Sequence, residues 1–167
     1  MKKAILTAAL AALVAGCGAP ETKPSAAAAK SACEPPPTTL VTKDLVEGDG
    51  RTAIPLSSAI VFYTGWVYDP CKPDHKGAQF DSNVGKRVPF GFRIGAGKVI
   101  KGWDEGVPGM KEGGKRLLLV PSALGYGATE IPGKIPANSA LVFEVELMQL
   151  SGPGLPPPIN RQEPPKQ

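Results

Sequence analysis

Histidine is almost absent from this sequence, and its scarcity removes two kinds of active site. His75 is the only histidine among 167 residues. It stands alone in a polar stretch near Cys71, where we expect a solvated side chain, so a hydrolytic triad has no base. Cys33, Cys71, His75 and the nearby Asp74 do not have the spacing of zinc ligands, and we expect no metal site.

A complete phosphate-binding loop is also lacking. The run Gly95-Ala96-Gly97-Lys98 resembles the end of such a loop, but Phe92 stands where its first glycine belongs. Val99 replaces the serine or threonine that should follow the lysine. We therefore expect no nucleotide, and no cofactor of any other kind.

The sequence has no large excess of either charge. It contains 19 basic and 15 acidic residues, which gives a formal net charge of +4. Two of the lysines lie in residues 1–16, so the remainder of the chain has 17 basic against 15 acidic residues. Charges so evenly balanced and so scattered do not favour a nucleic-acid partner.

No apolar run is long enough to cross a bilayer as a helix. The run at residues 4–14 follows two lysines and precedes small residues, which predicts an export signal over residues 1–16. The phrase Val14-Ala15-Gly16-Cys17 resembles a bacterial lipobox, in which the cysteine is diacylated and becomes the first residue. The alternative is an ordinary signal peptide in which Cys17 has no role. With Gly18 next, we expect a lipoprotein of the bacterial cell envelope, anchored to the outer membrane and facing the periplasm.

Proline is concentrated at the two ends of the chain, where extended segments cannot build a core. We predict a proline- and alanine-rich tether at 17–38, one folded domain at 39–151 and a disordered proline-rich tail at 152–167. Export implies an oxidising compartment, so Cys33 and Cys71 form an even pair once Cys17 is acylated. We expect a disulfide between them, with two free thiols as the alternative.

Alternating hydrophobicity predicts five strands, and one short segment predicts a helix. The strands are expected at 39–46, 59–68, 88–94, 115–120 and 140–150. A helix over 100–107 is stopped by Gly106, Pro108 and Gly109, and 69–78 reads as a polar loop. The predicted fold class is antiparallel α+β, with one sheet face covered by the helix.

Aromatic and aliphatic residues are spread over the middle of the sequence with a single carboxylate among them. Several stand beside glycines that mark turns, so they are expected to line a small cup. An apolar cup with few polar groups is suited to holding an apolar group out of water rather than to hydrolysis, and rotation about a prolyl peptide bond needs little more. The set comprises Tyr63, Phe80, Asp81, Phe90, Val99, Ile100, Trp103, Tyr126 and Phe143.

Six phrases within residues 39–150 closely resemble the FKBP-type peptidyl-prolyl isomerases. They occur in the right order and at workable spacings, and together they are highly specific, although each alone is weak. The phrases are VFYTG at 61–65, FDS at 80–82, PF at 89–90, VIKGWDEG at 99–106, LGYGA at 124–128 and LVFEVEL at 141–147.

The resemblance implies a strongly twisted five-stranded antiparallel sheet wrapped around one short helix, with a pocket between the two. It implies Trp103 as the pocket floor, with Phe80 and Asp81 at one rim and Tyr126 at the other. The side walls are then Tyr63, Phe90, Val99, Ile100 and Phe143, and the flap loop after Tyr126 carries Ile131 and Ile135.

Three departures from the family pattern stand out. Lys86 occupies a position where the family often has an arginine that holds the aspartate, so either Arg87 takes over or Asp81 is held less firmly. Ile131 replaces a frequent histidine and makes the flap more apolar. The loop from Asp69 to Gln79 is longer than in the minimal member of the family.

The expected activity is peptidyl-prolyl isomerisation of Xaa-Pro bonds in exported proteins by an apolar, desolvating pocket. Phe80, Asp81 and Tyr126 are the expected catalytic residues, and the remaining pocket residues, with Ile131 and Ile135, bind substrate. The alternative is a non-catalytic peptide-binding or chaperone module of the cell envelope. We expect proline-containing polypeptides and macrolide inhibitors as partners, a lipid anchor as the only membrane contact, and a monomer, since no dimerisation helix is evident.

A further hypothesis concerns the tail. Leu155-Pro156-Pro157-Pro158 is an apolar-prolyl sequence of the type that such a pocket accepts, so the tail is a candidate weak autoinhibitor of its own or a neighbour's pocket. The alternative is a solvated, polyproline-like tail.

Overall fold

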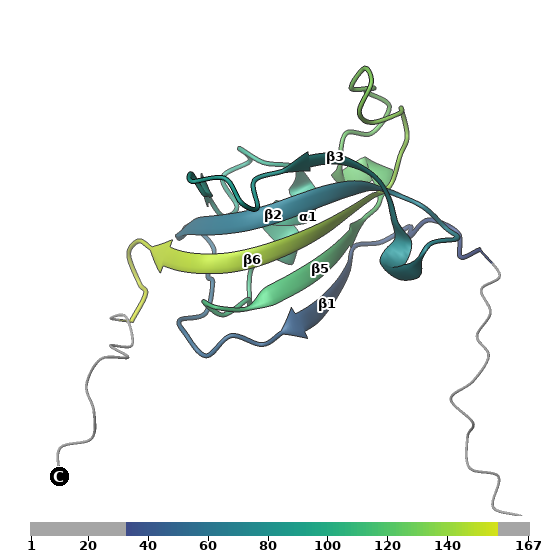
Figure 1. Ribbon diagram of the computed structural model, residues 1–167. Helices are drawn as coiled ribbons and strands as arrows, with labels where there is room; N and C mark the ends of the chain where they lie inside the picture. The colour runs from purple at the N-terminus through teal and green to yellow at the C-terminus, as the bar shows by residue number, and fades with distance from the viewer. Residues whose placement is uncertain (1–32, 157–167) are drawn as a thin grey trace, which may run out of the picture. The chain divides into compact units, whose positions relative to one another are not determined.

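The computed structural model describes residues 33–156, which form an antiparallel sheet with one short α-helix against it (Figure 1). The predicted signal 1–16, Cys17, most of the tether 17–38 and most of the tail 152–167 lie outside the described residues. Within residues 33–156, no helix is long and apolar enough to cross a membrane. The strands are β1 (Val41–Val46), β2 (Ser58–Tyr68), β3 (Lys76–Ser82), β4 (Phe90–Arg93), β5 (Lys115–Val120) and β6 (Leu141–Ser151), and the helices are α1 (Lys101–Gly106) and the 3₁₀ turns η1 (Pro73–His75) and η2 (Ser122–Leu124).

All strand pairings are antiparallel, and β2 and β6 form the centre of the sheet. The strand order is β1-β5-β6-β2-β3. Strand β4 pairs with residues 58–61 of β2, on the same edge where β3 pairs with residues 64–68. On β6, alternate residues are buried and the intervening Glu144 and Glu146 are partly exposed, as the period of two predicts. The buried face carries Leu141, Phe143, Val145 and Leu147.

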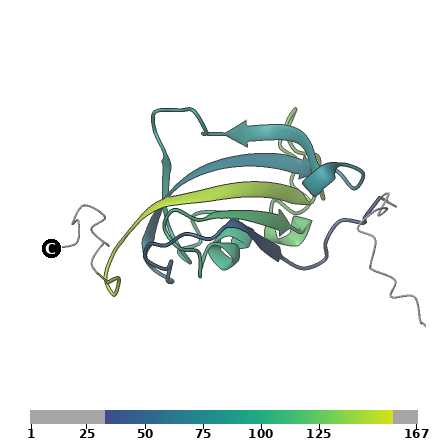
Figure 2. The same cartoon turned by 60° about the horizontal axis from the view of Figure 1, so that its bottom comes forward.

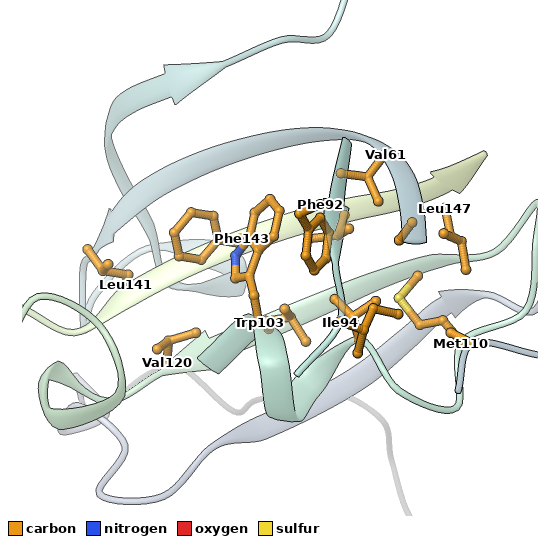
Figure 3. Close-up of a cluster of buried hydrophobic side chains, with 14 of the residues drawn as sticks. Val61, Phe92, Ile94, Trp103, Met110, Val120, Leu141, Phe143 and Leu147 are labelled. Carbon is orange, nitrogen blue, oxygen red and sulfur yellow. The ribbon is translucent and has the colours of Figure 1, made fainter. Parts of the chain in front are cut away.

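Helix α1 lies against the buried face of this sheet (Figure 2). Two of its residues are glycines because the helix approaches β5 too closely for a side chain: a Cβ on Gly102 would lie 2.5 Å from Val120 Cγ1, and one on Gly106 would lie 2.9 Å from Leu118 Cδ2. Trp103 projects from α1 toward Phe143 on β6, in the middle of the apolar core (Figure 3). The close approach of α1 therefore places an indole ring under the sheet.

The loop before α1 is fixed by an acid of the helix itself. The carboxylate of Asp104 accepts hydrogen bonds from the backbone N–H groups of Gly95 and Gly97, at 2.8 and 2.9 Å. The backbone of Ile100 is extended at the start of the helix. Residues 95–100 are thus held beside Trp103 rather than free in solvent.

The α+β class with a single α-helix is confirmed, but the sheet has six strands where the sequence predicted five. The additional strand is β3, whose first residues were placed in a polar loop. Its N-terminal half, Lys76-Gly77-Ala78-Gln79, has no alternation of apolar side chains, and it is extended because it pairs with β2 as an edge strand with register irregularities. The expected strand at 88–94 begins only at Phe90, and Val88 is exposed.

The segment before β1 is fastened to the loop between β2 and β3. Cys33 and Cys71 form a disulfide, the Glu34 N–H donates to the Pro70 carbonyl at 3.0 Å, and the Tyr68 hydroxyl reaches the carbonyl of Glu34 at 3.1 Å. The expectation of a solvated His75 is wrong. Its ring stacks on Tyr68 at 4.7 Å, and its Nε2 lies 3.4 Å from a carboxylate oxygen of Glu34, because η1 turns the ring inward.

Candidate active site

A hollow of about 400 Å³ lies between α1 and the sheet. The structure brings together nine residues that the sequence predicted from six separate regions of the chain. Two further residues, Gly97 and Lys98, complete the wall. The predicted lining residues present are Tyr63, Phe80, Asp81, Phe90, Val99, Ile100, Trp103, Tyr126 and Phe143.

The indole of Trp103 forms the base of this hollow and is 4% exposed. Four aromatic rings surround it at centroid distances between 5.0 and 6.0 Å, mostly edge to face, which is the arrangement that aromatic quadrupoles favour. The indole N–H is buried and has no hydrogen-bond partner among the described residues. The surrounding rings belong to Tyr63, Phe90, Phe92 and Phe143.

Phe92 is one of these rings but is not part of the hollow's lining. It is 7% exposed, stacks on Phe90 and supports Trp103 from below. Phe92 is therefore a core residue beneath the site rather than a residue that a substrate can reach.

Phe80 reaches the hollow because Gly65 on the neighbouring strand has no side chain. A Cβ at Gly65 would lie 2.6 Å from Phe80 Cζ and 2.9 Å from Phe143 Cε1. The two phenyl rings meet edge to face at 5.6 Å over this glycine. A glycine on β2 therefore creates the space that one rim of the site occupies.

Asp81 is the one carboxylate in the lining, and two donors hold it. The Tyr63 hydroxyl donates to its Oδ2 at 2.5 Å, and the Ser82 N–H donates to its Oδ1 at 2.8 Å. Neither Lys86 nor Arg87 makes a hydrogen bond or ion pair with it in the described chain. Of the two alternatives that Lys86 left open, Arg87 does not take over the arginine's role in this structure. The neutral hydroxyl of Tyr63 holds Asp81 instead.

Both tyrosines of the site remain neutral over a wide pH range. Burial raises the pKa of Tyr63, and its hydrogen bond to Asp81 and the charge of that carboxylate raise it further. Burial also raises the pKa of Tyr126, with a further contribution from the charge of Asp81. Each hydroxyl is consequently available as a hydrogen-bond donor.

Sequence reasoning did not identify Asn83, which positions Tyr63. Its buried side chain accepts a hydrogen bond from the Tyr63 N–H at 2.6 Å and donates to the Val61 carbonyl at 3.1 Å. These two bonds satisfy backbone groups of β2 between Val61, where β2 pairs with β4, and Thr64, where it pairs with β3. Nothing in the sequence except the preceding Asp81-Ser82 pointed to this residue. The sequence analysis also did not predict Lys98 as a lining residue, although it directly precedes Val99, which was predicted to line the pocket.

Ile131 and Ile135 do not line the hollow beside Trp103. They form a two-residue bridge with reciprocal hydrogen bonds of 2.9 Å and lie along a second hollow, beside Val67 and Ala78. Ile135 is 2% exposed and belongs to the core, so its side chain is not accessible to a substrate in this structure. The sequence expected Ile135 to bind substrate, whereas in this structure its side chain lies in the core.

The start of the tail is held away from the pocket lining. Leu155 packs against the core, and the Pro156 carbonyl accepts a hydrogen bond from Arg51 at 3.4 Å. Neither residue lines the hollow. These two residues are therefore not placed for autoinhibition.

Comparisons with known proteins agree with this geometry. Residues 50–148 match the model of the family described as FKBP-type peptidyl-prolyl cis-trans isomerase. The chain is 47% identical over 111 residues to an FK506-binding protein of Neisseria meningitidis serogroup A, covering 66% of this chain and 95% of that protein. It is 50% identical over 88 residues to the human peptidyl-prolyl cis-trans isomerase FKBP2, covering 53% of this chain and 57% of that protein.

A solved structure shows the same architecture. The crystal structure of AtFKBP13 matches with a TM-score of 0.58 and 35% sequence identity, over 70% of this chain and 96% of that one. The family match covers more than half of the chain, including every residue of the hollow beside Trp103. This chain belongs to the FKBP-type peptidyl-prolyl cis-trans isomerases and is an enzyme of that class.

Proposed function

We propose that this isomerase works in a bacterial cell envelope, tethered through a lipid on Cys17, and accelerates prolyl rotation in exported proteins. The observation that supports this location is the Cys33–Cys71 disulfide. Disulfides of this structural kind form and persist in oxidising compartments, to which the predicted signal at residues 1–16 directs the chain.

The proposed mechanism is removal of water from the rotating peptide bond. Resonance in the planar amide gives a barrier of about 18–20 kcal/mol. At the twisted transition state the resonance is lost and the carbonyl oxygen carries less negative charge, so water stabilises the planar form better. A pocket walled by aromatic rings withholds that water and favours the twisted form, which is the differential binding that catalysis requires.

In this mechanism the proline ring sits on Trp103. Tyr63, Phe90 and Phe143 enclose it, since their rings stand around the indole within 6.0 Å. The Ile100 N–H and the Tyr126 hydroxyl anchor carbonyl groups of the bound chain. Tyr126 is suited to this because its raised pKa keeps the proton on the oxygen.

Phe80 and Asp81 act at the opposite rim. Phe80 contacts the residue before proline, which its position over Gly65 allows. Asp81 acts electrostatically, by orienting the rotating carbonyl and by holding the Tyr63 hydroxyl, with no covalent or general-base step. The hollow of about 400 Å³ is also within the usual size of small-molecule sites, and we propose that it binds macrolides of the kind named for the Neisseria relative.

Turnover of a short Leu-Pro peptide tests the catalytic proposal. We expect the purified protein to accelerate cis-trans exchange and a macrolide inhibitor to abolish the acceleration. Rates equal to those in buffer, with peptide still bound, would indicate the alternative of a peptide-binding or chaperone module. Full activity with the inhibitor bound would contradict the desolvating pocket.

Acylation and fractionation test the proposed location. Cells expressing the chain are labelled with a fatty acid, and the label is compared between wild type and Cys17→Ser. We expect label and membrane association in the wild type and neither in the variant. Label in both would place the lipid elsewhere, and label in neither would leave an ordinary signal peptide.

A further inference from the structure

A second hollow, of about 660 Å³, lies on the same face of β2 as the active-site pocket. Tyr63 of the pocket pairs with Val145, and Val67 of the second hollow pairs with Leu141, in one continuous register between β2 and β6. Residues four apart on a strand point to the same face. The two hollows therefore follow each other along one strand.

Two segments of the chain form walls of both hollows. On β3, Phe80 and Asp81 line the pocket, whereas Gly77 and Ala78 line the second hollow. After η2, Tyr126 lines the pocket, whereas residues 130–131 and 133–136 of the flap line the second hollow. The Phe80 ring, packed over Gly65, stands between them. The second hollow therefore lies next to the site of the established reaction, on the far side of the Phe80 ring.

The chemistry of the second hollow suits a polypeptide. Val67, Ala78, Ile131 and Pro136 offer apolar surface, and Glu130 and Lys134 provide charges of opposite sign beside it. In the described chain β3 pairs only with β2, so it is an edge strand with backbone groups on its outer side that an extended peptide can use.

We propose that the second hollow is an extended subsite for the substrate's own chain and receives an apolar side chain about four residues before the isomerising proline. The count follows from the strand: four residues of extended chain span about 13 Å, which is the separation of Tyr63 and Val67 along β2. The direction rests on the proposed function, in which Phe80 contacts the residue before proline. This subsite gives the enzyme a preference among proline-containing sequences.

Two peptides of equal length test the subsite. Both carry Leu-Pro, and they differ only in having leucine or serine four residues before the proline. For wild type we expect kcat/KM to be about tenfold higher with leucine, from partial burial of one aliphatic side chain. In Ala78→Tyr the added ring fills the hollow, and the ratio of the two rates falls to about one.

Gln79→Tyr is the matched control. It adds the same ring one position along β3, where the side chain lines neither hollow, and we expect the leucine preference to be unchanged. Should Ala78→Tyr not fold, Lys134→Phe places a ring on the opposite wall and makes the same test.

The outcomes separate this inference from the proposed function. A wild-type ratio near one would overturn the subsite and leave the hollow to another occupant, such as the chain's own tether or a second copy. Persistence of the preference in Ala78→Tyr would overturn it too. If wild type turns over neither peptide, the catalytic proposal fails, and tryptophan fluorescence titration of the same two peptides then decides the subsite by their ratio of affinities.

Discussion

The Tyr63 hydroxyl donates a hydrogen bond of 2.5 Å to Asp81 Oδ2 and thereby joins two polar side chains of a largely apolar wall. A neutral phenol, rather than a cationic side chain, fixes the carboxylate. The pair consequently acts as one unit, which a double-mutant cycle can measure.

Tyr63→Phe and Asp81→Asn should each lower kcat/KM for a Leu-Pro peptide by about tenfold, since a hydrogen bond to a charged group contributes about 1.5–3 kcal/mol. The double variant should lose little more than the worse single variant, because each change already breaks the shared contact. Multiplicative losses would show that the two residues act independently. Gln79→Asn, outside the pocket, is the control for a nonspecific effect on β3.

Alkaline titration tests the protonation state of the site. All three tyrosines of the sequence, Tyr63, Tyr68 and Tyr126, have a raised pKa, chiefly through burial. Phenolate absorbance at 295 nm should therefore not appear at the ordinary tyrosine pKa of about 10, and kcat/KM should stay flat to that pH. Because the pKa of each tyrosine is raised in the folded state, the contribution of the neutral phenols to the free energy of unfolding is complete below pH about 10. It is lost as the pH rises through the folded-state values. A phenolate signal at pH 10 with the fold intact would contradict this.

Gly65→Ala should damage the rim of the pocket. The new Cβ would meet the Phe80 and Phe143 rings at 2.6 and 2.9 Å, so at least one ring must move. We expect a loss of about 1–3 kcal/mol in the free energy of unfolding, as for overpacked cores, together with a lower kcat/KM. Gly91→Ala on β4 is the matched control, because its Cβ would approach Ala59 O at no less than 4.0 Å. Normal activity in Gly65→Ala would show that the position of Phe80 is not required.

The sequence predicted the aromatic pocket well, because its members stand in phrases whose spacing the fold preserves. It failed where tertiary pairing overrides local pattern. Strand β3 begins in a segment without apolar alternation, and only its partner β2 makes it extended. Ile135 was assigned by position in the flap, but its bridge to Ile131 turns it into the core. The role of Asn83 depends on the gap between β3 and β4 along β2, which the sequence alone does not show.

The carboxylate of Glu112 ties three distant parts of the chain together. It accepts hydrogen bonds from the Arg51 side chain at 2.7 Å and from the Leu150 N–H at 2.6 Å, and both charged side chains are largely buried. These hydrogen bonds, led by that from Arg51, lower the pKa of Glu112. Glu112→Gln should lower the free energy of unfolding by about 2 kcal/mol, in the range for losing charge-assisted hydrogen bonds.

The contribution of the Arg51–Glu112 contact to stability should depend on pH in the acid range. Because the folded-state pKa of Glu112 is lowered, its contribution to stability is present above the ordinary glutamate pKa and is lost as the pH falls through the folded value. The variant should lack this part of the acid dependence. Glu47→Gln is the control, since the Glu47–Lys111 pair is exposed and should contribute little. Equal effects of the two substitutions would contradict a special role for Glu112.

The Cys33–Cys71 bond should stabilise the fold without supporting catalysis. It closes a loop with a sequence separation of 38, for which loop-closure entropy gives an upper value of about 4 kcal/mol. The double variant Cys33→Ser/Cys71→Ser should therefore unfold at lower urea concentration. Exchange of the Glu34 and Asp69 backbone amides should accelerate, because these amides donate to the Pro70 and His75 carbonyls around η1, which lose their anchor. Neither cysteine lines the pocket, so kcat/KM for a short Leu-Pro peptide should be unchanged. A loss of turnover at unaltered stability would contradict this. It would mean that the disulfide acts on the pocket itself, through the edge strand β3, which begins five residues after Cys71.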